Sequence, residues 1–212
     1  MNAAVSKRHE SKLRKEGVGL IAGVDESGIG PLAGPVVAAA VLLKEDYRLK
    51  GLDDSKKLRA ESREALFSQI LGASISVSIG IVDNSTIDRV NILQASLQAM
   101  LHAVELLSVA PEHILVDGIR KIPGINIPQT AIKHGDRVSS AIAAASVIAK
   151  VVRDRIMKNY DVIYPHYCFC EHKGYGTEKH MKRIKKFGTC PIHRLSYQPV
   201  IKVLKSRGMI FI

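Results

Sequence analysis

The chain has 212 residues, 46% of them hydrophobic and 24% charged, a length and composition typical of one globular domain with a buried core. Its three cysteines, an odd number, argue against a disulfide framework and favour a reducing compartment, so a cytoplasmic location is expected. The N-terminal residues lack the apolar core of a signal peptide, and no stretch is apolar over the roughly 18 residues that a membrane helix needs. No membrane association is therefore expected.

Basic residues are concentrated in the last third of the chain. Residues 150–212 contain fourteen Lys or Arg and four Asp or Glu, so they carry +10 of the net charge of +11. A basic face on a near-neutral body favours a polyanionic partner, and a solvated basic surface is the alternative. We therefore divide the chain into an N-terminal extension (1–17), a main domain (18–163) and a basic helical C-terminal part (164–212).

The N-terminal half contains three predicted strands. Residues 20–25 and 35–43 are short apolar runs, and the glycine-rich segment GIGPLAG between them predicts a tight connection. In residues 74–82, Ile or Val alternates with Ser or Gly. This alternation is typical of a half-buried strand.

Helices alternate with strands in the rest of the chain. Helices are predicted at 62–71, 84–108, 139–160, 177–187 and after Pro199, and further strands at 113–116 and 129–133. Hairpin-like strands followed by helix-linked strands favour an α/β fold in which helices flank a mixed sheet. The segment 164–176 is the best candidate for a hinge between the body and the C-terminal part.

Four acidic residues lie where predicted elements begin or end. Asp25 and Glu26 end the first strand, Asp117 ends a later strand, and Asp136 precedes a long helix. Ligands of open α/β sheets bind beyond the carboxyl ends of strands, and carboxylates gathered there repel one another unless cations neutralise them. Oxygen ligands suit Mg²⁺ or Mn²⁺, and two such ions can clamp the attacking and leaving oxygens of a phosphodiester.

Each acid also has a plainer interpretation. An Asp-Gly pair after a strand is typical of a turn, Asp136 can be a helix N-cap, and Asp25 and Glu26 can be exposed charges at a strand end. Neighbouring residues of a regular strand point to opposite faces. Asp25 and Glu26 therefore share one site only if the strand ends or bends there, which Gly28 and Gly30 permit.

The segment GIGPLAG differs from a dinucleotide-binding loop. Its glycine spacing misses that fingerprint, Pro31 lacks an amide N–H, and two acids precede it, so a pyrophosphate would be repelled. Close approach of a nucleic-acid strand to the backbone is the functional interpretation. A plain hairpin turn is the alternative.

Several motifs together resemble the ribonuclease HII family. Residues 23–37, GVDESGIGPLAGPVV, closely resemble the signature of that family. The other matching segments, in the family's order, are LDDSKKL (52–58), VDG (116–118), GD (135–136), AAASVIAK (143–150), RDR (153–155) and HKGYGT (172–177). The resemblance covers about residues 18–200.

This resemblance implies a ribonuclease H-like fold: a mixed five-stranded sheet flanked by helices, with a small helical C-terminal part. It implies a metal-dependent endonuclease that cuts the RNA strand of RNA/DNA hybrids. It also implies cutting on the 5′ side of single ribonucleotides in duplex DNA, which leaves 3′-OH and 5′-phosphate ends. Residues 18–163 would then be the catalytic domain. Protein partners are left open, and a monomer is expected.

The resemblance also implies roles for individual residues. Asp25, Glu26, Asp117 and Asp136 would be the catalytic residues and would ligate Mn²⁺ or Mg²⁺. Tyr175 falls on the family's tyrosine, which packs against the sugar at the RNA–DNA junction.

The backbone of Gly28, Ile29 and Gly30 would recognise the ribose 2′-OH, the group that distinguishes RNA from DNA. Here the sequence departs from the family, which normally has Arg between these two glycines. An aliphatic side chain cannot make the bidentate contacts of a guanidinium. We therefore predict weakened or altered substrate binding, with the metal site kept.

Other polar clusters are interpreted more plainly. Lys56 and Lys57 match the family and can contact phosphate, or they can be exposed lysines at a helix start. Asp154 lies among basic residues at helical spacing, which favours an ion network. The cysteines and histidines of residues 166–193 lack paired Cys-x-x-Cys spacing, so free thiols and loop histidines are favoured over a zinc site.

Two other classes of function compete with this interpretation. One is a non-catalytic nucleic-acid-binding module that uses the basic helix 177–187 along a duplex backbone. Carboxylates at strand ends argue against it, because without metal they repel phosphate. The other is a different metal-dependent phosphodiesterase, such as a DNA junction nuclease, which would ignore the 2′-OH.

Overall fold

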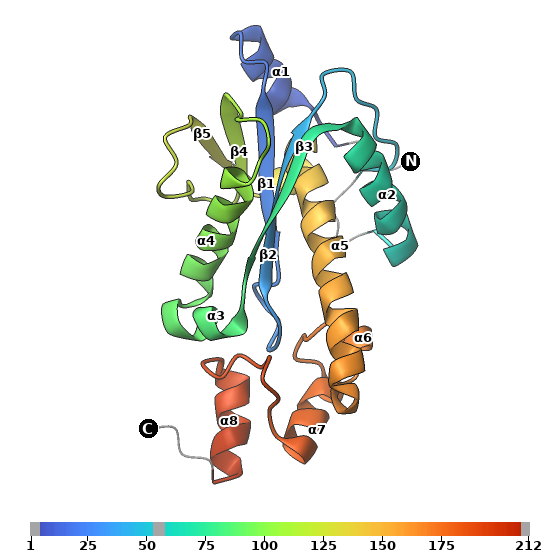
Figure 1. Cartoon of the computed structure of the whole chain (residues 1–212), viewed down its shortest axis with the longest axis vertical. Coiled ribbons are helices and arrows are strands. Elements are labelled where there is room, and N and C mark those ends of the chain that lie inside the picture. The colour runs from blue at the N-terminus through green and yellow to red at the C-terminus, as the bar shows by residue number, and fades with distance from the viewer. Residues whose placement is uncertain (1–4, 53–57, 209–212) are drawn as a thin grey trace.

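A five-stranded mixed sheet forms the centre of the computed structural model, which describes residues 5–52 and 58–208 (Figure 1). The strands are β1 (Ile21–Ser27), β2 (Val36–Leu43), β3 (Ser74–Val82), β4 (His113–Asp117) and β5 (Gln129–Ile132), in the order β3-β2-β1-β4-β5. β1 pairs antiparallel with β2 and parallel with β4, β2 pairs antiparallel with β3, and β4 pairs parallel with β5. The predicted α/β class is confirmed.

Helices cover both faces of the sheet. They are α1 (Arg8–Lys15), α2 (Ala60–Ala73), α3 (Asn84–Val90), α4 (Ile92–Glu105), α5 (Ser140–Ile163), α6 (Phe169–His172), α7 (Glu178–Phe187) and α8 (Gln198–Ser206), with 3₁₀ turns η1 (Gly135–Arg137) and η2 (Pro165–Tyr167). α5 packs on β1 and β2, whereas α4 packs on β2 and β3. The helices α6 to α8 lie at the end of the molecule far from α1 (Figure 1).

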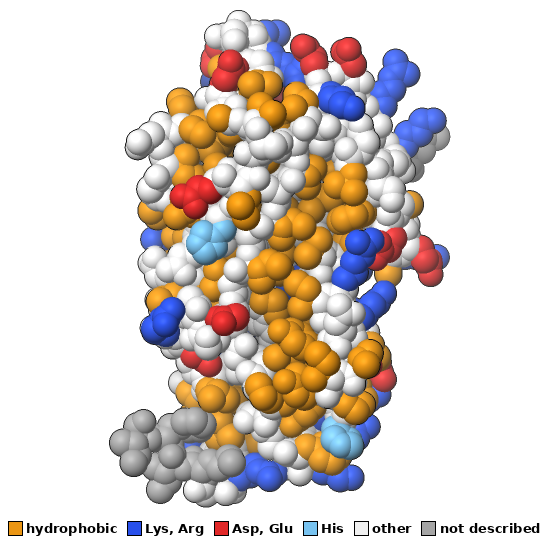
Figure 2. All heavy atoms as spheres, in the orientation of Figure 1, with side chains coloured by type: hydrophobic (Ala, Val, Ile, Leu, Met, Phe, Trp, Pro, Cys, Tyr) orange, Lys and Arg blue, Asp and Glu red, His pale blue; other side chains and the backbone are white. Residues whose placement is uncertain are grey.

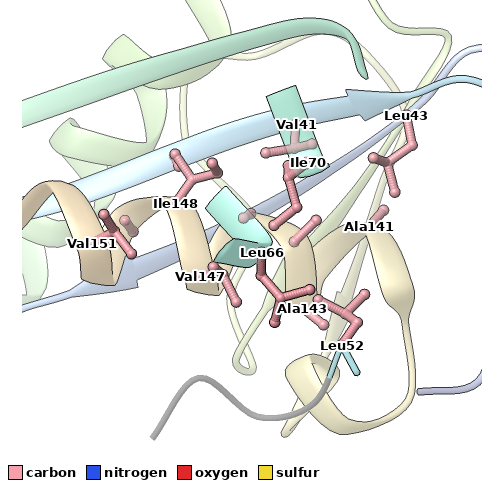
Figure 3. Close-up of a cluster of buried hydrophobic side chains, with 14 of the residues drawn as sticks. Val41, Leu43, Leu52, Leu66, Ile70, Ala141, Ala143, Val147, Ile148 and Val151 are labelled. Atoms are coloured by element: carbon pink, nitrogen blue, oxygen red, sulfur yellow. The ribbon is translucent and has the colours of Figure 1, made fainter. Parts of the chain in front are cut away.

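A hydrophobic core fills the space between α5, α2 and the sheet. The buried cluster drawn in Figure 3 includes Val41 and Leu43 of β2, Val147 and Ile148 of α5, and Leu66 of α2. A second core lies on the other face, beneath α4. Because the sheet is buried on both sides, β2 is a continuous apolar run rather than an alternating one.

β1 and α5 approach each other closely, and this contact sets the distance between the helix and the sheet. A Cβ on Gly23 would lie 2.0 Å from the carbonyl carbon of Ala141, so only glycine fits there. The buried start of α5 is rich in alanine, which also keeps the helix near the strand. Asp25 is two residues beyond Gly23 and therefore faces the same helix.

One predicted helix differs from the structure, and the half-buried strand predicted at 74–82 is confirmed as β3. The helix predicted over 84–108 is two helices, because Asn91 adopts a left-handed φ of 72° and its side chain caps α4 by accepting the N–H of Gln94. In β3 the serine face is the more buried one: the Ser78 hydroxyl donates to the Ala103 carbonyl, while Ile75 is 43% exposed. On the same face, a Cβ on Gly80 would lie 2.0 Å from the carbonyl oxygen of Ala99, so the close approach of α4 excludes a larger residue there.

Apolar side chains reach the surface along the centre of the molecule. Figure 2 shows them as a band over the region of the central strands. Within the described ranges, no helix is long and apolar enough to cross a bilayer.

The segment 164–176, the candidate for a hinge, contains η2 and α6, and its Tyr167, Phe169 and His172 are buried.

Substituting Gly23 tests the contact between β1 and α5. The methyl group of Gly23→Ala would overlap the Ala141 backbone, so we expect the free energy of unfolding to fall by roughly 1–3 kcal/mol. Urea denaturation measures it. Gly72→Ala is the matched control, because a Cβ there meets nothing within 4 Å and alanine favours the helix by about 0.5–1 kcal/mol. Equal stability of Gly23→Ala and the wild-type protein would contradict the packing argument.

Candidate active site

Three acidic residues meet at the carboxyl ends of two neighbouring strands. Asp25 and Glu26 lie near the end of β1, and Asp117 is the last residue of β4. The parallel register aligns Val24 with Val116, so the residues that follow them lie at the same edge. Parallel pairing thus brings together acids that are about ninety residues apart in the chain.

The fourth acid, Asp136, lies one strand further along the same edge of the sheet. We call the edge that carries Asp25, Glu26, Asp117 and Asp136 the acidic edge. Asp136 lies in η1, directly after β5, and is only 5% exposed. Its neighbour Gly135 donates its N–H to Asp117 Oδ1 at 2.6 Å. A Cβ on Gly135 would come within 2.5 Å of the Ile142 side chain, so α5 holds this turn close to β4.

Burial and like charge act together on Asp25. Its side chain is 5% exposed, and burial, followed by the charges of Glu26 and Asp117, raises the pKa of Asp25 well above its usual value. Two hydrogen bonds oppose this rise in pKa. The Glu26 N–H donates to Asp25 Oδ1 at 2.7 Å, and the Ser146 hydroxyl of α5 bonds the same carboxylate.

The donor set fits a hard divalent cation, although the side chains do not enclose one. Across residues 5–52 and 58–208, no three Asp, Glu, His or Cys side chains converge closely enough to hold an ion together. One oxygen each of Asp25 and Asp117 is turned to a backbone N–H. Mg²⁺ commonly takes only one or two protein carboxylates and completes its shell with water and substrate phosphate. An edge of mutually repelling carboxylate oxygens suits such an ion.

Two cavities meet at Glu26 and Ile29. The larger, of about 320 Å³, is lined by Glu26, Ile29 and Asp117 and by apolar side chains that include Leu93 and Ile119. The smaller, of about 170 Å³, is lined by Glu26, Ser27, Gly28, Ile29, Gly30, Ser146, Lys150 and Tyr175. The structure therefore brings the expected substrate-binding loop and Tyr175 to the side of Glu26.

The two glycines of the 28–30 loop differ in how strictly the structure requires them. Gly28 has a left-handed φ of 110°, and a Cβ there would come within 2.4 Å of Arg153 Nε. The Arg153 side chain lies beneath the loop. Position 28 therefore requires glycine because a larger residue would overlap this buried arginine. A Cβ on Gly30 would lie 3.7 Å from the Tyr175 ring, which is an ordinary contact.

Several residues of this region were not expected to belong to the site. Ser146 and Lys150 lie in the AAASVIAK motif, and their four-residue spacing on a predicted helix was a usable signal. Leu93 and Ile119 carried no such signal, because their cavity forms only when α4 packs beside β4. Lys56 and Lys57 lie outside the described residues.

The remaining polar clusters have structural partners. Asp154 pairs with Lys150 at 2.5 Å and with Arg63 at 3.4 Å, which confirms the expected ion network. His180 Nε2 lies 3.1 Å from His193 Nε2 in the buried C-terminal part. Burial lowers the pKa of His180 to about 3 and that of His193 to about 4, so both are neutral at pH 7.

Comparison with solved structures defines the class of protein. The fold is similar to that of the ribonuclease H2 from Pyrococcus horikoshii OT3, with a TM-score of 0.74 and 27% identity over 88% of this chain and 98% of that one. It is also similar to Bst-RNase HIII in complex with Mn²⁺, with a TM-score of 0.66 and 20% identity over 88% of this chain and 70% of that one. The fold is that of a ribonuclease H-like nuclease.

Sequence comparison narrows the class. Residues 22–200 match the family model of ribonuclease HII. The ribonuclease HII of Geobacter metallireducens is 52% identical over 191 residues, which are 90% of this chain and 89% of the relative. The chain belongs to the ribonuclease HII family. It is a type 2 ribonuclease H, an endonuclease for RNA/DNA hybrids, and the non-catalytic binding module is set aside.

The electrostatics of Asp25 predict that removing its charge stabilises the folded protein. Burial and neighbouring charges raise the pKa of Asp25 in the folded chain, so its ionised form destabilises the fold at neutral pH. That cost vanishes as the pH falls below the unfolded pKa of about 4. In EDTA, Asp25→Asn should raise the free energy of unfolding at pH 7 by roughly 1–3 kcal/mol, and the gain should shrink toward pH 4.

Urea denaturation at several pH values checks this prediction. Asp46→Asn is the matched control, since Asp46 is exposed, and it should change little at any pH. A destabilised Asp25→Asn at pH 7, or a gain that grows in acid, would contradict the proposed repulsion.

Proposed function

We propose that this ribonuclease cuts the RNA strand of RNA/DNA hybrids and also the 5′ side of single ribonucleotides embedded in duplex DNA, leaving 3′-OH and 5′-phosphate ends. The observation that carries the proposal is the cavity shared by Glu26, the 28–30 loop and Tyr175. In it, a group that recognises one ribose lies beside the acidic edge. A nuclease that recognises one 2′-OH next to its cutting site needs no long hybrid.

Asp25, Glu26, Asp117 and Asp136 are the catalytic residues in this proposal and would hold two Mn²⁺ or Mg²⁺ ions. When bound, the ions would supply an activated water and stabilise the leaving 3′-oxygen. The chain's part is to hold the carboxylates in place: the Gly135 N–H fixes Asp117, and Ser146 fixes Asp25. The Mn²⁺ complex of the structurally similar ribonuclease HIII supports the choice of ion.

Substrate recognition in this proposal uses backbone and aromatic groups. The amides of residues 28–30 would bond the ribose 2′-OH and the adjoining phosphate. The Tyr175 ring, 40% exposed beside Gly30, would pack against the sugar at the junction. The basic C-terminal part, including α7, would follow the duplex backbone by charge. We propose that it forms a unit on the catalytic domain of 18–163, that residues 1–17 are an extension, and that a monomer suffices.

Removal of one carboxylate tests the proposed chemistry. Asp25→Asn should lower the cutting rate at least about a thousandfold, because the loss weakens the binding of the ions that stabilise the transition state. The measurement uses Mn²⁺ and a labelled DNA duplex with one embedded ribonucleotide, and gel mapping locates the cut. Asp46→Asn carries the same chemical change at an exposed position and should cut normally.

Three substrates distinguish the possible outcomes: a long RNA/DNA hybrid, a DNA duplex with one ribonucleotide, and an all-DNA duplex or junction. Cutting of a long hybrid but not of a single ribonucleotide would refute the finer part of the proposal. Cutting of an all-DNA duplex or junction would favour a nuclease that ignores the 2′-OH. Full activity of Asp25→Asn would overturn the assignment of the acidic edge.

Restoring an arginine tests the departure at position 29. Ile29 is 45% exposed and lines both cavities, so Ile29→Arg can reach a phosphate without repacking the core. We expect a KM about 3–10-fold lower and a dependence on log salt steeper by about 0.9, as for one added phosphate contact. Leu106→Arg, at an exposed position after α4, adds the same charge elsewhere. Equal KM values for the wild-type protein and Ile29→Arg would contradict the inference.

A further inference from the structure

Two fully buried arginines lie beneath the segment that follows β1. Arg153 of α5 and Arg194 are each 0% exposed, and both donate to backbone carbonyls of residues 28–35. Arg153 bonds the carbonyls of Pro35 at 3.0 Å and Ala33 at 3.1 Å. A buried guanidinium is costly unless its donors are satisfied, so these bonds fix both arginines and the loop.

Arg194 donates hydrogen bonds to two carbonyls of the 28–30 loop and to that of Gly34. Its Nη2 donates to Gly28 O at 2.6 Å, its Nη1 to Ile29 O at 2.9 Å, and its Nε to Gly34 O at 3.1 Å. The Tyr197 hydroxyl accepts from Arg194 Nη1 and donates to Ile29 O, both at 2.8 Å. The carbonyls of the two peptide groups at positions 28 and 29 are therefore held from below.

The segment that carries Arg194 is itself anchored to α3. Asp88 accepts the N–H groups of Leu195 at 2.8 Å and of Ser196 at 2.9 Å. Asn84 donates to the carbonyl of His193 at 3.1 Å. The guanidinium thus has a fixed position relative to the sheet.

The direction of the carbonyls sets the direction of the amides. The described residues contain no cis peptide bond, and in a trans peptide the C=O and the following N–H point opposite ways. Because the Gly28 and Ile29 carbonyls point to Arg194, the N–H groups of Ile29 and Gly30 point away from it. The far side of the loop lines the cavity of Glu26 and Tyr175.

We propose that Arg194, assisted by Tyr197, is a positioning residue that aims the Ile29 and Gly30 amides at the substrate ribose and its phosphate. The inference deepens the proposed function and rests on it. A cation beneath two peptide groups also polarises their N–H donors. This buried charge acts through the backbone at the position where Ile29 offers no charge of its own.

The test compares recognition of the 2′-OH with binding of the duplex. In Mn²⁺, the KM and kcat for a duplex with one ribonucleotide are measured together with the Ki of the same duplex made wholly of DNA. We expect Arg194→Gln to lower kcat/KM about tenfold and Tyr197→Phe about threefold, the size of one or two lost hydrogen bonds. The Ki should stay within about twofold, because phosphate contacts supply most of the binding of a duplex without a 2′-OH.

Tyr167→Phe is the matched control. Tyr167 also donates its hydroxyl to a backbone carbonyl, that of Gly188 at 3.0 Å, but this carbonyl does not belong to residues 28–35. It should leave kcat/KM and Ki unchanged. Tyr197→Phe alone decides the question if circular dichroism shows that Arg194→Gln does not fold.

Three results would overturn the inference or its basis. Unchanged kcat/KM in Tyr197→Phe refutes the positioning role. An equal loss in kcat/KM and in affinity for the all-DNA duplex shows a merely structural role. A wild-type Ki equal to its KM shows that the enzyme does not recognise the 2′-OH, so the proposed function fails before the role of Arg194 is reached.

Discussion

The parallel pairing of β1 with β4 brings like charges together, and much of the surrounding structure holds them there. Asp25 is buried beside Glu26 and Asp117, and this raises its pKa. Such an arrangement opposes folding by itself. The Glu26 and Gly135 N–H groups and the Ser146 hydroxyl hold the carboxylates in place. The glycine at position 23 allows α5, which carries Ser146, to approach the strand closely enough to do so.

A second set of contacts supports the neighbouring loop. The acidic edge is held by contacts with η1 and with Ser146 of α5, whereas residues 28–35 are held by the buried guanidinium groups of Arg153 and Arg194. Both arginines are satisfied by backbone carbonyls, which carry partial rather than full negative charge. The hydrogen bonds that hold residues 28–35 to the two guanidinium groups therefore involve no carboxylate.

The apolar side chain at position 29 has an apolar setting. Ile29 shares its larger cavity with Leu93, Leu97, Met100 and Ile119, and Leu93 and Ile119 are 41% and 76% exposed. The site thus offers hydrophobic surface on one side of Glu26, and backbone donors, a lysine and a tyrosine on the other. With Ile29, the contact between this site and a nucleic acid would depend less on charge than it would with an arginine at position 29.

The sequence alone determined the fold class, the strand positions and the four candidate acids, because apolar runs, turn residues and the motif around Asp25 are local features of the chain. It did not determine the break at Asn91 or the buried serine face of β3, since both depend on how closely α4 packs against the sheet. Nor did it indicate the roles of Arg153 and Arg194: Arg153 belongs to the RDR motif, and Arg194 looks like one more member of a basic C-terminal third. Only the tertiary structure brings those guanidinium groups under a loop that is more than a hundred residues away in the chain, and it does so because buried donors must find acceptors wherever the fold offers them.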